Sequence, residues 1–448
     1  MFKKKHSGNV VIAGMGQGGL VAASYLALNG YKVDVFEKAK KGEVSYPWYD
    51  DITFNIFEKV GIPAPPRECY TQKSKWLFVS PDEKNSLAVP PMPPMVEVSV
   101  SRRGLVEHLC DLAEGAGCTL HYGEAVEELL LSGDTVVGVK TSKKKYNSDL
   151  VIDASGLHSK LRRQVPKKFG IQAEPAHDDL MSGYRAFYKR RPGSATPDPE
   201  STLYVMHKDG PGISWCNLND RDEVDMLCLR IGGMTKDEYS ELAAALKANH
   251  DMVSDEAIMP PRPVDVGVRY TMSRLVADGY AAVGDSAFMT MPFMGSGIEA
   301  SMQAGRMLAE TVVNGGRDRF TAKNLWNYQV AFFKKLGALY MAIDIVKRYV
   351  LFLDPKTVNW VFGCGAVTSE DMKLLSTDEN NKASISPFRI IKKIGILLSR
   401  PRLIAGLLGA VIRAALGLFM AMRLPKKYNE KEIAEWQREY EKCIKHVK

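Results

Sequence analysis

The chain has 448 residues, of which 45% are hydrophobic and 25% charged, so it can bury a sizeable core. Its length exceeds that of one simple core and predicts two closely packed domains with further elements. The net charge is +8, but no nucleic-acid recognition motif accompanies it, which argues against a nucleic-acid binder.

The seven cysteines are scattered and show no CxxC or other metal-ligand spacing, so no metal site is expected. The sequence starts Met-Phe-Lys-Lys-Lys-His and enters the first predicted strand without a secretory leader. Both features predict a protein of the reducing cytoplasm.

The first predicted elements form a strand–turn–helix–strand unit. A β-branched run at 9–13 predicts a strand, the pattern at 20–29 a helix, and 31–36 a second strand. This order and length are typical of a dinucleotide-binding fold.

The turn after the first strand reads Gly14-Met-Gly16-Gln-Gly-Gly19. In such a turn the first glycine permits the tight bend, the second lets the backbone approach a diphosphate, and the third lets helix pack on strand. Glu37 closes the second strand, where a carboxylate can accept hydrogen bonds from a ribose. A purely structural glycine turn would leave Glu37 unexplained.

Further along the chain, 101–116 predicts a helix, and 119–122, 135–141 and 150–152 predict strands. The proline-punctuated stretch 63–94 predicts loops around strands. From 182 to 231 the pattern is rich in strands, which predicts a sheet inserted between two parts of the nucleotide domain. An amphipathic helix follows at 236–249, and strand character returns at 269–271 and 280–283.

A second motif runs from Asp153 through Gly156 and Ser159 to Arg162. By itself it is equally compatible with a strand that ends in a polar turn, with Arg162 solvated. A third motif, Gly284-Asp285 to Gly295-Ser296-Gly297-Ile298, again follows a strand and opens a helix. Its carboxylate can hold ribityl hydroxyls, and its helix amides can stabilise negative charge on a flavin ring.

The three motifs in this order resemble the FAD-dependent hydroxylases of the para-hydroxybenzoate type and their relatives, over residues 8 to 315. The resemblance implies FAD as the cofactor. It also implies that Arg102, or Arg103 beside it, contacts the FAD diphosphate, that the backbone of Val126 meets the adenine, and that Asp285 lies at the ribityl chain.

Within this superfamily the chain is similar to the geranylgeranyl reductases. Asp153-Ala-Ser-Gly156, the Pro211-Gly-Ile-Ser-Trp215 segment and the stretches at 46–52 and 57–63 carry this likeness. Cys216-Asn-Leu-Asn departs from the run that usually follows the Trp, and the cysteine of archaeal members is missing from the early stretch. The Trp-x-Trp-x-Ile-Pro motif of the halogenases is absent.

We therefore expect an α/β (α+β) architecture with a Rossmann-like FAD-binding domain at 1–175 and 265–325. An antiparallel β-sheet substrate domain would occupy 176–264, and a helical region 326–448. Trp48, Trp215 and Phe293 are candidates to line an apolar substrate slot, although ordinary core is the alternative. No catalytic acid can be named, and His158 is more typical of a structural or solvated histidine.

The C-terminal region is basic and apolar together. Nine Lys and Arg residues and no acid occur from 388 to 427, interleaved with aliphatic residues. The longest uncharged run, 403–412, is shorter than the roughly 20 residues of a membrane span. We expect amphipathic helices on the inner face of a membrane, the alternative being a helical cap or dimer contact, and a solvated charged helix at 436–447.

The leading functional hypothesis is an FAD-dependent reductase that saturates C=C bonds of an isoprenoid or other lipid-like substrate. The alternatives are a monooxygenase of an aromatic or quinone ring and a flavin-binding redox sensor without turnover. No second GxGxxG motif is present, so electrons would come from transiently docked NAD(P)H or a ferredoxin-type carrier.

Overall fold

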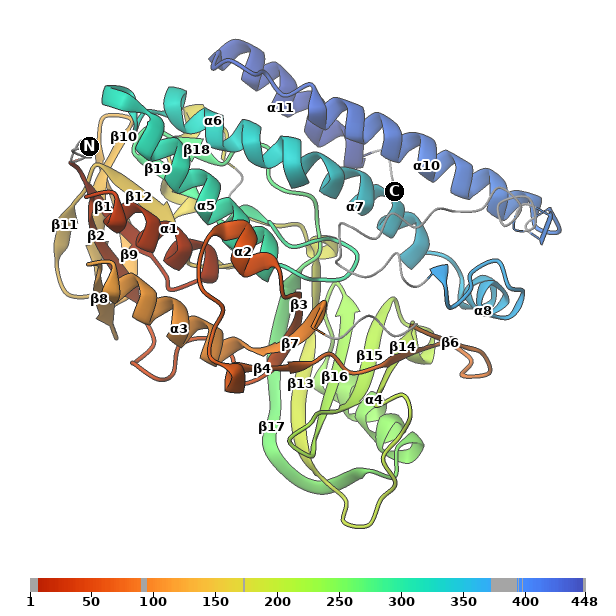
Figure 1. The fold of residues 1–448 in the computed structure, drawn as a ribbon. Coiled ribbons are helices and arrows are strands. Elements are labelled where there is room, and N and C mark those ends of the chain that lie inside the picture. The colour runs from red at the N-terminus through yellow and green to blue at the C-terminus, as the bar shows by residue number, and fades with distance from the viewer. Residues whose placement is uncertain are drawn as a thin grey trace.

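The computed structural model describes residues 7–89, 95–171, 174–371, 393, 395–396 and 398–445. Parts of the predicted proline-punctuated stretch and of the basic C-terminal region lie outside these residues. A nucleotide-binding body, a large sheet and a set of C-terminal helices are the three parts of the fold (Figure 1).

The central sheet of the nucleotide-binding body has six strands in the order β18-β19-β12-β1-β2-β8. Strand β1 runs parallel to β2 and β12, with Val11 opposite Asp34 and Val151. The strands are β1 (Asn9–Ala13), β2 (Lys32–Glu37), β8 (Thr119–Tyr122), β12 (Leu150–Asp153), β18 (Val276–Ala277) and β19 (Tyr280–Ala282).

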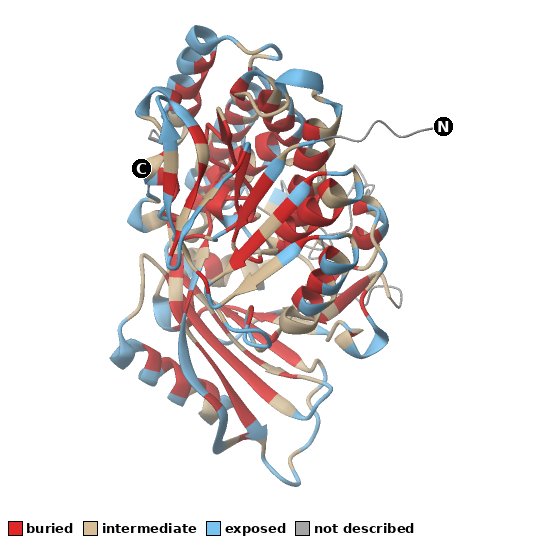
Figure 2. Cartoon of the chain, turned by 90° about the vertical axis from the view of Figure 1, so that its left-hand side faces the viewer, coloured by how far each residue is buried: buried red, intermediate tan, exposed pale blue. Residues whose placement is uncertain are grey.

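Strand β1 is a central parallel strand and is apolar on both faces, because helices cover the sheet on each side. Val10 to Ala13 are at most 2% exposed, and Figure 2 shows red, buried residues throughout the interior of this body. The main helices of this body are α1 (Gln17–Leu28), α2 (Ile56–Val60), α3 (Arg102–Gly115) and α5 (Ile298–Asn314). The predicted strand at 269–271 is wrong, since this segment is irregular backbone that leads into the sheet.

Two three-stranded sheets flank the central one. The first has the order β11-β10-β9 and the second β3-β7-β4. Their strands are β9 (Val126–Ser132), β10 (Thr135–Thr141), β11 (Lys145–Asn147), β3 (Tyr49–Thr53), β4 (Tyr70–Gln72) and β7 (Glu97–Ser101).

The large sheet has seven strands in the order β17-β13-β16-β15-β14-β5-β6. It is antiparallel except where β14 runs parallel to β5, and β5 and β6 come from the chain before 176–264. Its strands are β5 (Trp76–Val79), β6 (Ser86–Ala88), β13 (Leu180–Arg190), β14 (Ser201–Val205), β15 (Gly212–Leu218), β16 (Glu223–Ile231) and β17 (Val253–Gly267). Helix α4 (Lys236–Asn249) covers one face, and the other faces the nucleotide-binding body.

The C-terminal helices extend the layer of α5. They are α6 (Ala322–Phe332), a π-helical segment (Phe333–Gly337), α7 (Ala338–Leu351), α8 (Pro355–Gly363), α10 (Pro401–Met422) and α11 (Glu430–Lys445). The expectation of a solvated helix at 436–447 is wrong for α11. Its polar sequence still carries Ile433, Trp436 and Tyr440 on one face, and these side chains are at most 5% exposed; Trp436 and Tyr440 pack on the π segment, and α11 contacts α10.

Helix α10 is the one element of the described chain that is long and apolar enough to cross a membrane by length and composition. Its 22 residues have a mean hydropathy of 2.1 over the best window. The uncharged run 403–412 by itself is too short, but Arg413 is a single interruption and the helix continues to Met422. Length and composition are weak evidence for a span, and only 22% of that window is buried inside the protein.

Candidate functional site

The glycine turn between β1 and α1 packs tightly on Ala154, which follows β12. A Cβ added at Gly14 would lie 2.5 Å from the carbonyl oxygen of Ala154, and one at Gly19 would lie 2.7 Å from its Cβ. Gly14 also has φ +92°, in the left-handed region that favours glycine. Two of the three motif glycines are therefore required by the fold itself.

Gly16 differs from these two. It caps α1 with φ −68°, and an added Cβ would meet only the Ala154 carbonyl oxygen at 3.1 Å and the Ala154 Cβ at 3.8 Å. The protein does not need a glycine there as strictly. A close approach by a ligand explains the residue better, as expected for the diphosphate position.

Helices α1 and α5 cross at two glycines, which brings their N-termini together. A Cβ at Gly305 would lie 1.9 Å from the carbonyl oxygen of Gly18. The Gly18 amide donates to Ser301 Oγ at 3.0 Å. Because each helix carries unpaired N–H groups and partial positive charge at its start, two positive helix ends face one region of the site.

Glu37 at the end of β2 bends back over the glycine turn. Its Oε2 accepts from the Met15 amide at 3.1 Å, and its Oε1 accepts from the Ala39 amide at 2.9 Å. The Glu124 amide donates to the Glu37 carbonyl, which places Val126, two residues further, close to this strand end. The predicted ribose carboxylate and the predicted adenine contact thus lie on neighbouring segments.

The second motif connects the sheet to the third motif. Asp153 is fully buried and its carboxylate accepts from Ser159 Oγ at 2.5 Å and from Tyr280 Oη at 2.8 Å. Arg162 is 1% exposed and donates to the Ser286 carbonyl at 2.8 Å, so the alternative of a solvated Arg162 is wrong. Its guanidinium donates to the carbonyl oxygens of Leu157 and Ser286, and Arg162 therefore lies against the loop that carries Asp285.

The third motif forms the loop before α5. Asp285 is exposed and accepts from Thr290 Oγ1 at 2.8 Å. A Cβ at Gly297 would lie 3.3 Å from Asp285 Oδ1, so this carboxylate lies directly beside the start of α5. The turn is closed by hydrogen bonds from the Met291 amide to the Ser296 carbonyl and from the Gly295 amide to the Met291 carbonyl. Asp285, Gly295, Ser296, Gly297 and Ile298 therefore form one compact group, and their contact with the flavin stays a prediction.

Arg102 starts α3 and binds Asp50 of β3, with Nη1 3.0 Å from Oδ2. Its backbone amide donates to the Trp48 carbonyl, and its guanidinium lies 5.5 Å from the centre of the Tyr46 ring. The Nε atoms of Arg102 and of Arg103 are buried without a hydrogen-bond partner in the described residues. Unsatisfied donors fit a ligand, and the contact of Arg102 with the diphosphate stays a prediction.

The large sheet presents an apolar wall toward these loops. Trp48, Phe187, Leu227 and Leu229 are among its buried members, and Trp215 packs against them. Arg185 of β13 lies within this wall, with its guanidinium 4.7 Å from the ring centre of Trp48 and 5.2 Å from that of Trp215. The structure thus brings two of the predicted substrate residues to one cation.

Arg185 was not identified in the sequence, although a lone charge inside the apolar run Tyr184–Tyr188 was the available signal. Its guanidinium binds Asp225 through two hydrogen bonds of 2.9 and 2.7 Å, and Asp50 at 3.1 Å. Two carboxylates therefore neutralise the cation, and Coulomb attraction outweighs burial so that the pKa of Arg185 is raised.

Phe293 lies at the tip of the flavin-motif loop and is 38% exposed. Near it, a Cβ at Gly295 would lie 3.3 Å from Val266 Cγ1 of β17, so the loop touches the large sheet. Phe293 therefore belongs to the loop, where the loop meets the large sheet. Trp48 and Trp215 belong to the apolar wall. No aromatic ring contact joins Phe293 to either tryptophan in the described part of the chain.

Tyr46 is a second residue that the sequence did not identify as part of the site. Its ring stacks on Trp48 at 4.3 Å between ring centres, with an interplanar angle of 12°. Tyr46 is 45% exposed, yet partial desolvation by its neighbours raises its pKa; Arg102 opposes this, and Asp285 and Asp265 add to it. Its hydroxyl therefore stays protonated at neutral pH and lies within electrostatic reach of both the loop and the wall.

His158 sits at the same junction. Its Nε2 is 2.9 Å from Asp265 Oδ2 of β17, and its side chain is 66% exposed. It therefore connects the second motif to the large sheet at the surface, which agrees with a structural or solvated histidine.

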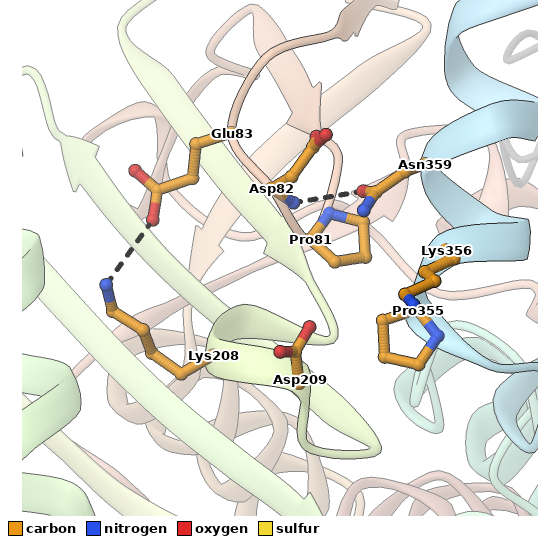
Figure 3. Close-up of a pocket in the computed structure, with 8 residues that line it drawn as sticks. All are labelled: Pro81, Asp82, Glu83, Lys208, Asp209, Pro355, Lys356 and Asn359. Carbon is orange, nitrogen blue, oxygen red and sulfur yellow. Dashed lines mark hydrogen bonds and ion pairs between the residues drawn. The ribbon is translucent and has the colours of Figure 1, made fainter.

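A separate hollow of about 630 Å³ lies elsewhere, between the β5–β6 turn, the β14–β15 turn and α8 (Figure 3). Its lining includes Asp82, Glu83, Lys208 and Lys356, and Lys208 pairs with Glu83 at 3.9 Å. None of the motif residues lines it. Among the described residues, no group of three or more His, Cys, Asp or Glu could hold a metal ion.

The arrangement fits FAD on several grounds. The Gly16 position leaves space, two helix N-termini converge, and Glu37 and Asp285 lie where a ribose and a ribityl chain would need acceptors. Buried arginine donors without partners lie near the start of α3. These features belong to the protein's own residues, and they fit FAD as the cofactor.

Comparisons with known proteins agree. A family model described as FAD binding domain matches residues 8–317. The chain is 22% identical to a digeranylgeranylglycerophospholipid reductase of Sulfolobus acidocaldarius, over 97% of both chains. It is 25% identical to a kynurenine 3-monooxygenase of Salinispora arenicola, over 66% of this chain and 70% of that protein.

Among solved structures, a geranylgeranyl bacteriochlorophyll reductase-like protein of Thermoplasma acidophilum superposes with a TM-score of 0.74. The match covers 90% of this chain and 99% of that one, at 18% identity. This likeness shows a shared fold, and it confirms the predicted α/β architecture with its parallel and antiparallel sheets.

Proposed function

The chain belongs to the FAD-binding domain family, with FAD as its cofactor, and on that premise we propose that this oxidoreductase saturates C=C bonds of an isoprenoid or other lipid-like substrate. The observation that carries the proposal is the apolar wall opposite the flavin loop. The buried cation within this wall, Arg185, is neutralised by Asp50 and Asp225, so the wall suits an uncharged hydrocarbon chain.

The likeness to archaeal lipid reductases supports the same substrate class. It extends over 97% of both chains for the Sulfolobus enzyme, and a Haloferax volcanii enzyme of the same name is 23% identical over 72% of this chain. The identity is low, so the likeness supports a class of substrate and not one lipid.

Bound FAD supplies hydride chemistry in such a site. The protein's own residues would do the rest. The glycine turn and the two helix N-termini hold the diphosphate, and Asp285 orients the ribityl chain. The wall around Trp48 and Trp215 excludes water from an alkene, and the Tyr46 hydroxyl, protonated at neutral pH, can supply a proton.

The second candidate is a monooxygenase of an aromatic or quinone ring. It is favoured by the likeness to the kynurenine 3-monooxygenase and by the stacked pair Tyr46 and Trp48, which could hold a flat substrate. A flavin-binding redox sensor is the third, and it would show no substrate-accelerated electron flow. For the electron donor we retain transiently docked NAD(P)H or a ferredoxin-type carrier.

Anaerobic photoreduction of the purified flavoprotein separates these functions. The reduced protein is mixed under argon with an unsaturated isoprenoid lipid, or with air, and flavin absorbance is followed. Reoxidation by the lipid, with a product heavier by two hydrogens, supports the reductase. Product formation only with stoichiometric oxygen uptake would support the monooxygenase instead. Stopped-flow reduction by NADPH, NADH or reduced ferredoxin identifies the donor.

A further inference from the structure

Over most of its length helix α10 turns small residues inward and large apolar residues outward. Its buried residues are Ala410, Ala414, Gly417 and Ala421, with Leu403 near its start. On the opposite side the helix exposes a stripe of six large side chains, each more than half exposed, which we call the outer stripe: Leu408, Val411, Ile412, Leu416, Phe419 and Met422. This is the reverse of an ordinary surface helix, whose large apolar side chains face the core.

The inner side explains the small residues. Helix α7 lies against α10, and a Cβ at Gly417 would be 2.5 Å from Ile345 Cδ1. A Cβ at Gly406 would be 2.1 Å from the Tyr349 hydroxyl. The helix is therefore docked closely on the protein by its small side, and the outer stripe is held rigidly at the surface. In Figure 1 α10 and α11 form the outermost helical layer, away from the α4 end of the large sheet.

Positive charge accompanies the outer stripe. Arg402 and Arg413 are exposed and lie three turns apart, so the helical period puts them on one flank of the stripe. Arg423, Lys426 and Lys427 follow at its C-terminal end. None of the ion pairs between described residues involves Arg402 or Arg413, and no acid occurs from 388 to 427.

We propose that the outer stripe docks α10, lying in the membrane plane, on a bilayer surface that contains anionic lipids. Six apolar side chains would enter the boundary between headgroups and acyl chains, and the flanking arginines would meet lipid phosphates. The wide apolar face matches the acyl-chain boundary. The cations, in a stretch of sequence without acids, match the lipid phosphates.

The same features argue against α10 as a span. Crossing the bilayer would put Arg413 near the centre of the hydrocarbon, where a charge is costly. It would also require α10 to leave α7 and expose the small inner side. An in-plane helix keeps both contacts and leaves Arg413 at the phosphates. The expected place is the inner face of a membrane bounding the cytoplasm, where anionic lipids are concentrated.

The inference does not depend on the substrate. A protein that acts on lipids would gain from such a face, but vesicle binding can be measured without any turnover. Deleting 388–448 is a poor test, because Tyr440 and Trp436 of α11 pack on Phe333 and belong to the core. Point variants on the exposed side of α10 preserve these contacts.

The experiment is co-sedimentation of the full-length flavoprotein with vesicles of phosphatidylcholine, with and without phosphatidylglycerol. We compare the wild type with the double variants Leu416→Glu/Phe419→Glu and Arg402→Glu/Arg413→Glu. Matched controls are Leu28→Glu, which is 67% exposed on α1, and Lys236→Glu, exposed on α4. FAD absorbance and far-UV circular dichroism report that each variant is folded, and gel filtration reports its oligomeric state.

We expect the wild type to bind anionic vesicles, each double variant to bind at least about tenfold more weakly, and the controls to bind as the wild type. Raising the ionic strength should weaken wild-type binding as the phosphates are screened. Equal binding by the wild type and both folded double variants would overturn the inference. So would a wild-type dimer that ignores vesicles and becomes monomeric in the Leu416→Glu/Phe419→Glu variant, because a second copy would then cover the stripe.

Discussion

Arg102 and Arg185 are bound to the two oxygens of one carboxylate, Asp50. Arg102 Nη1 lies 3.0 Å from Oδ2, and Arg185 Nη1 lies 3.1 Å from Oδ1. Arg185 continues to Asp225 at 2.7 Å. This chain of charges connects α3, next to the nucleotide site, with the middle of the apolar wall, so cofactor and substrate regions share a structural support.

Removal of Asp225 should destabilise the protein through Arg185. The two side chains are 5% and 7% exposed, and Asp225→Ala leaves a buried guanidinium with one partner fewer. We expect a loss of about 3 kcal/mol in the free energy of unfolding, measured by urea denaturation. Asp255→Ala breaks the exposed pair with Lys247 and should cost less than about 1 kcal/mol. Equal effects of the two variants would contradict the buried-pair argument.

Gly16→Leu should abolish FAD retention and preserve the fold. The backbone there suits any residue, and the neighbouring Ala154 carbonyl oxygen must yield by only a few tenths of an ångström, whereas a side chain would occupy the diphosphate position. The flavin absorbance of the purified protein and its far-UV circular dichroism report the two properties. Gly115→Leu, where an added Cβ meets nothing within 4 Å, is the control and should stay yellow. A yellow Gly16→Leu protein would refute the role of the first motif.

Gly305→Ala should weaken FAD binding from a distance. The added methyl group would lie 1.9 Å from the Gly18 carbonyl oxygen and force α1 and α5 apart, which displaces both helix N-termini. We expect a loss of about 1–3 kcal/mol in stability and a higher FAD dissociation constant by titration of the apoprotein. Gly409→Ala, where an added Cβ meets nothing within 4 Å, should leave FAD affinity unchanged and should not lower stability, because alanine favours a helix interior over glycine. Unchanged FAD affinity in Gly305→Ala would show that the crossing does not position the site.

The stability of the protein should depend on pH through Asp179. Burial alone would raise the pKa of this carboxyl, but Arg269, the Ala176 amide and Arg348 outweigh it and hold the pKa below its usual range. A depressed pKa stabilises the folded state above the unfolded value of about 3.9, and this contribution is lost as the pH falls toward the folded pKa.

Asp179→Asn should therefore lower the free energy of unfolding most at pH 7, by about 3 kcal/mol, and the difference from the wild type should shrink below about pH 5. Thermal denaturation across this range measures it. Asp255→Asn, in an exposed pair with Lys247, serves as the control. A difference that stays constant down to pH 3 would contradict the assignment.

Tyr46→Phe should retain FAD and the stack on Trp48 but slow the oxidation of reduced flavin by substrate at least about tenfold, because the phenolic proton is lost. The rate is measured anaerobically with the reduced protein. Tyr49→Phe removes a neighbouring hydroxyl whose ring lies 4.7 Å from Arg221, and it should leave the rate unchanged. An unaltered rate in Tyr46→Phe would exclude this hydroxyl as the proton source.

Local patterns predicted much of the nucleotide site. Gly14, Glu37 and Asp285 belong to short strand–turn–helix units whose geometry depends on residues close in sequence, and the structure places each where its motif requires. The sequence left a solvated Arg162 open as an alternative, because one of its two partners, the Leu157 and Ser286 carbonyls, is 124 residues away. No local signal distinguishes a solvated arginine from one that such a carbonyl holds.

The sequence by itself determined the fold class, the cofactor family and the basic, apolar character of the C-terminal region, since these follow from period, turn chemistry and composition. Only the tertiary structure decided that Trp48 and Trp215 meet at Arg185, that α11 is buried on one face, and that α10 turns its large side chains outward. The physical reason is that burial and pairing are properties of surfaces assembled from distant segments. The small residues of α10 acquire their meaning only when α7 lies against them.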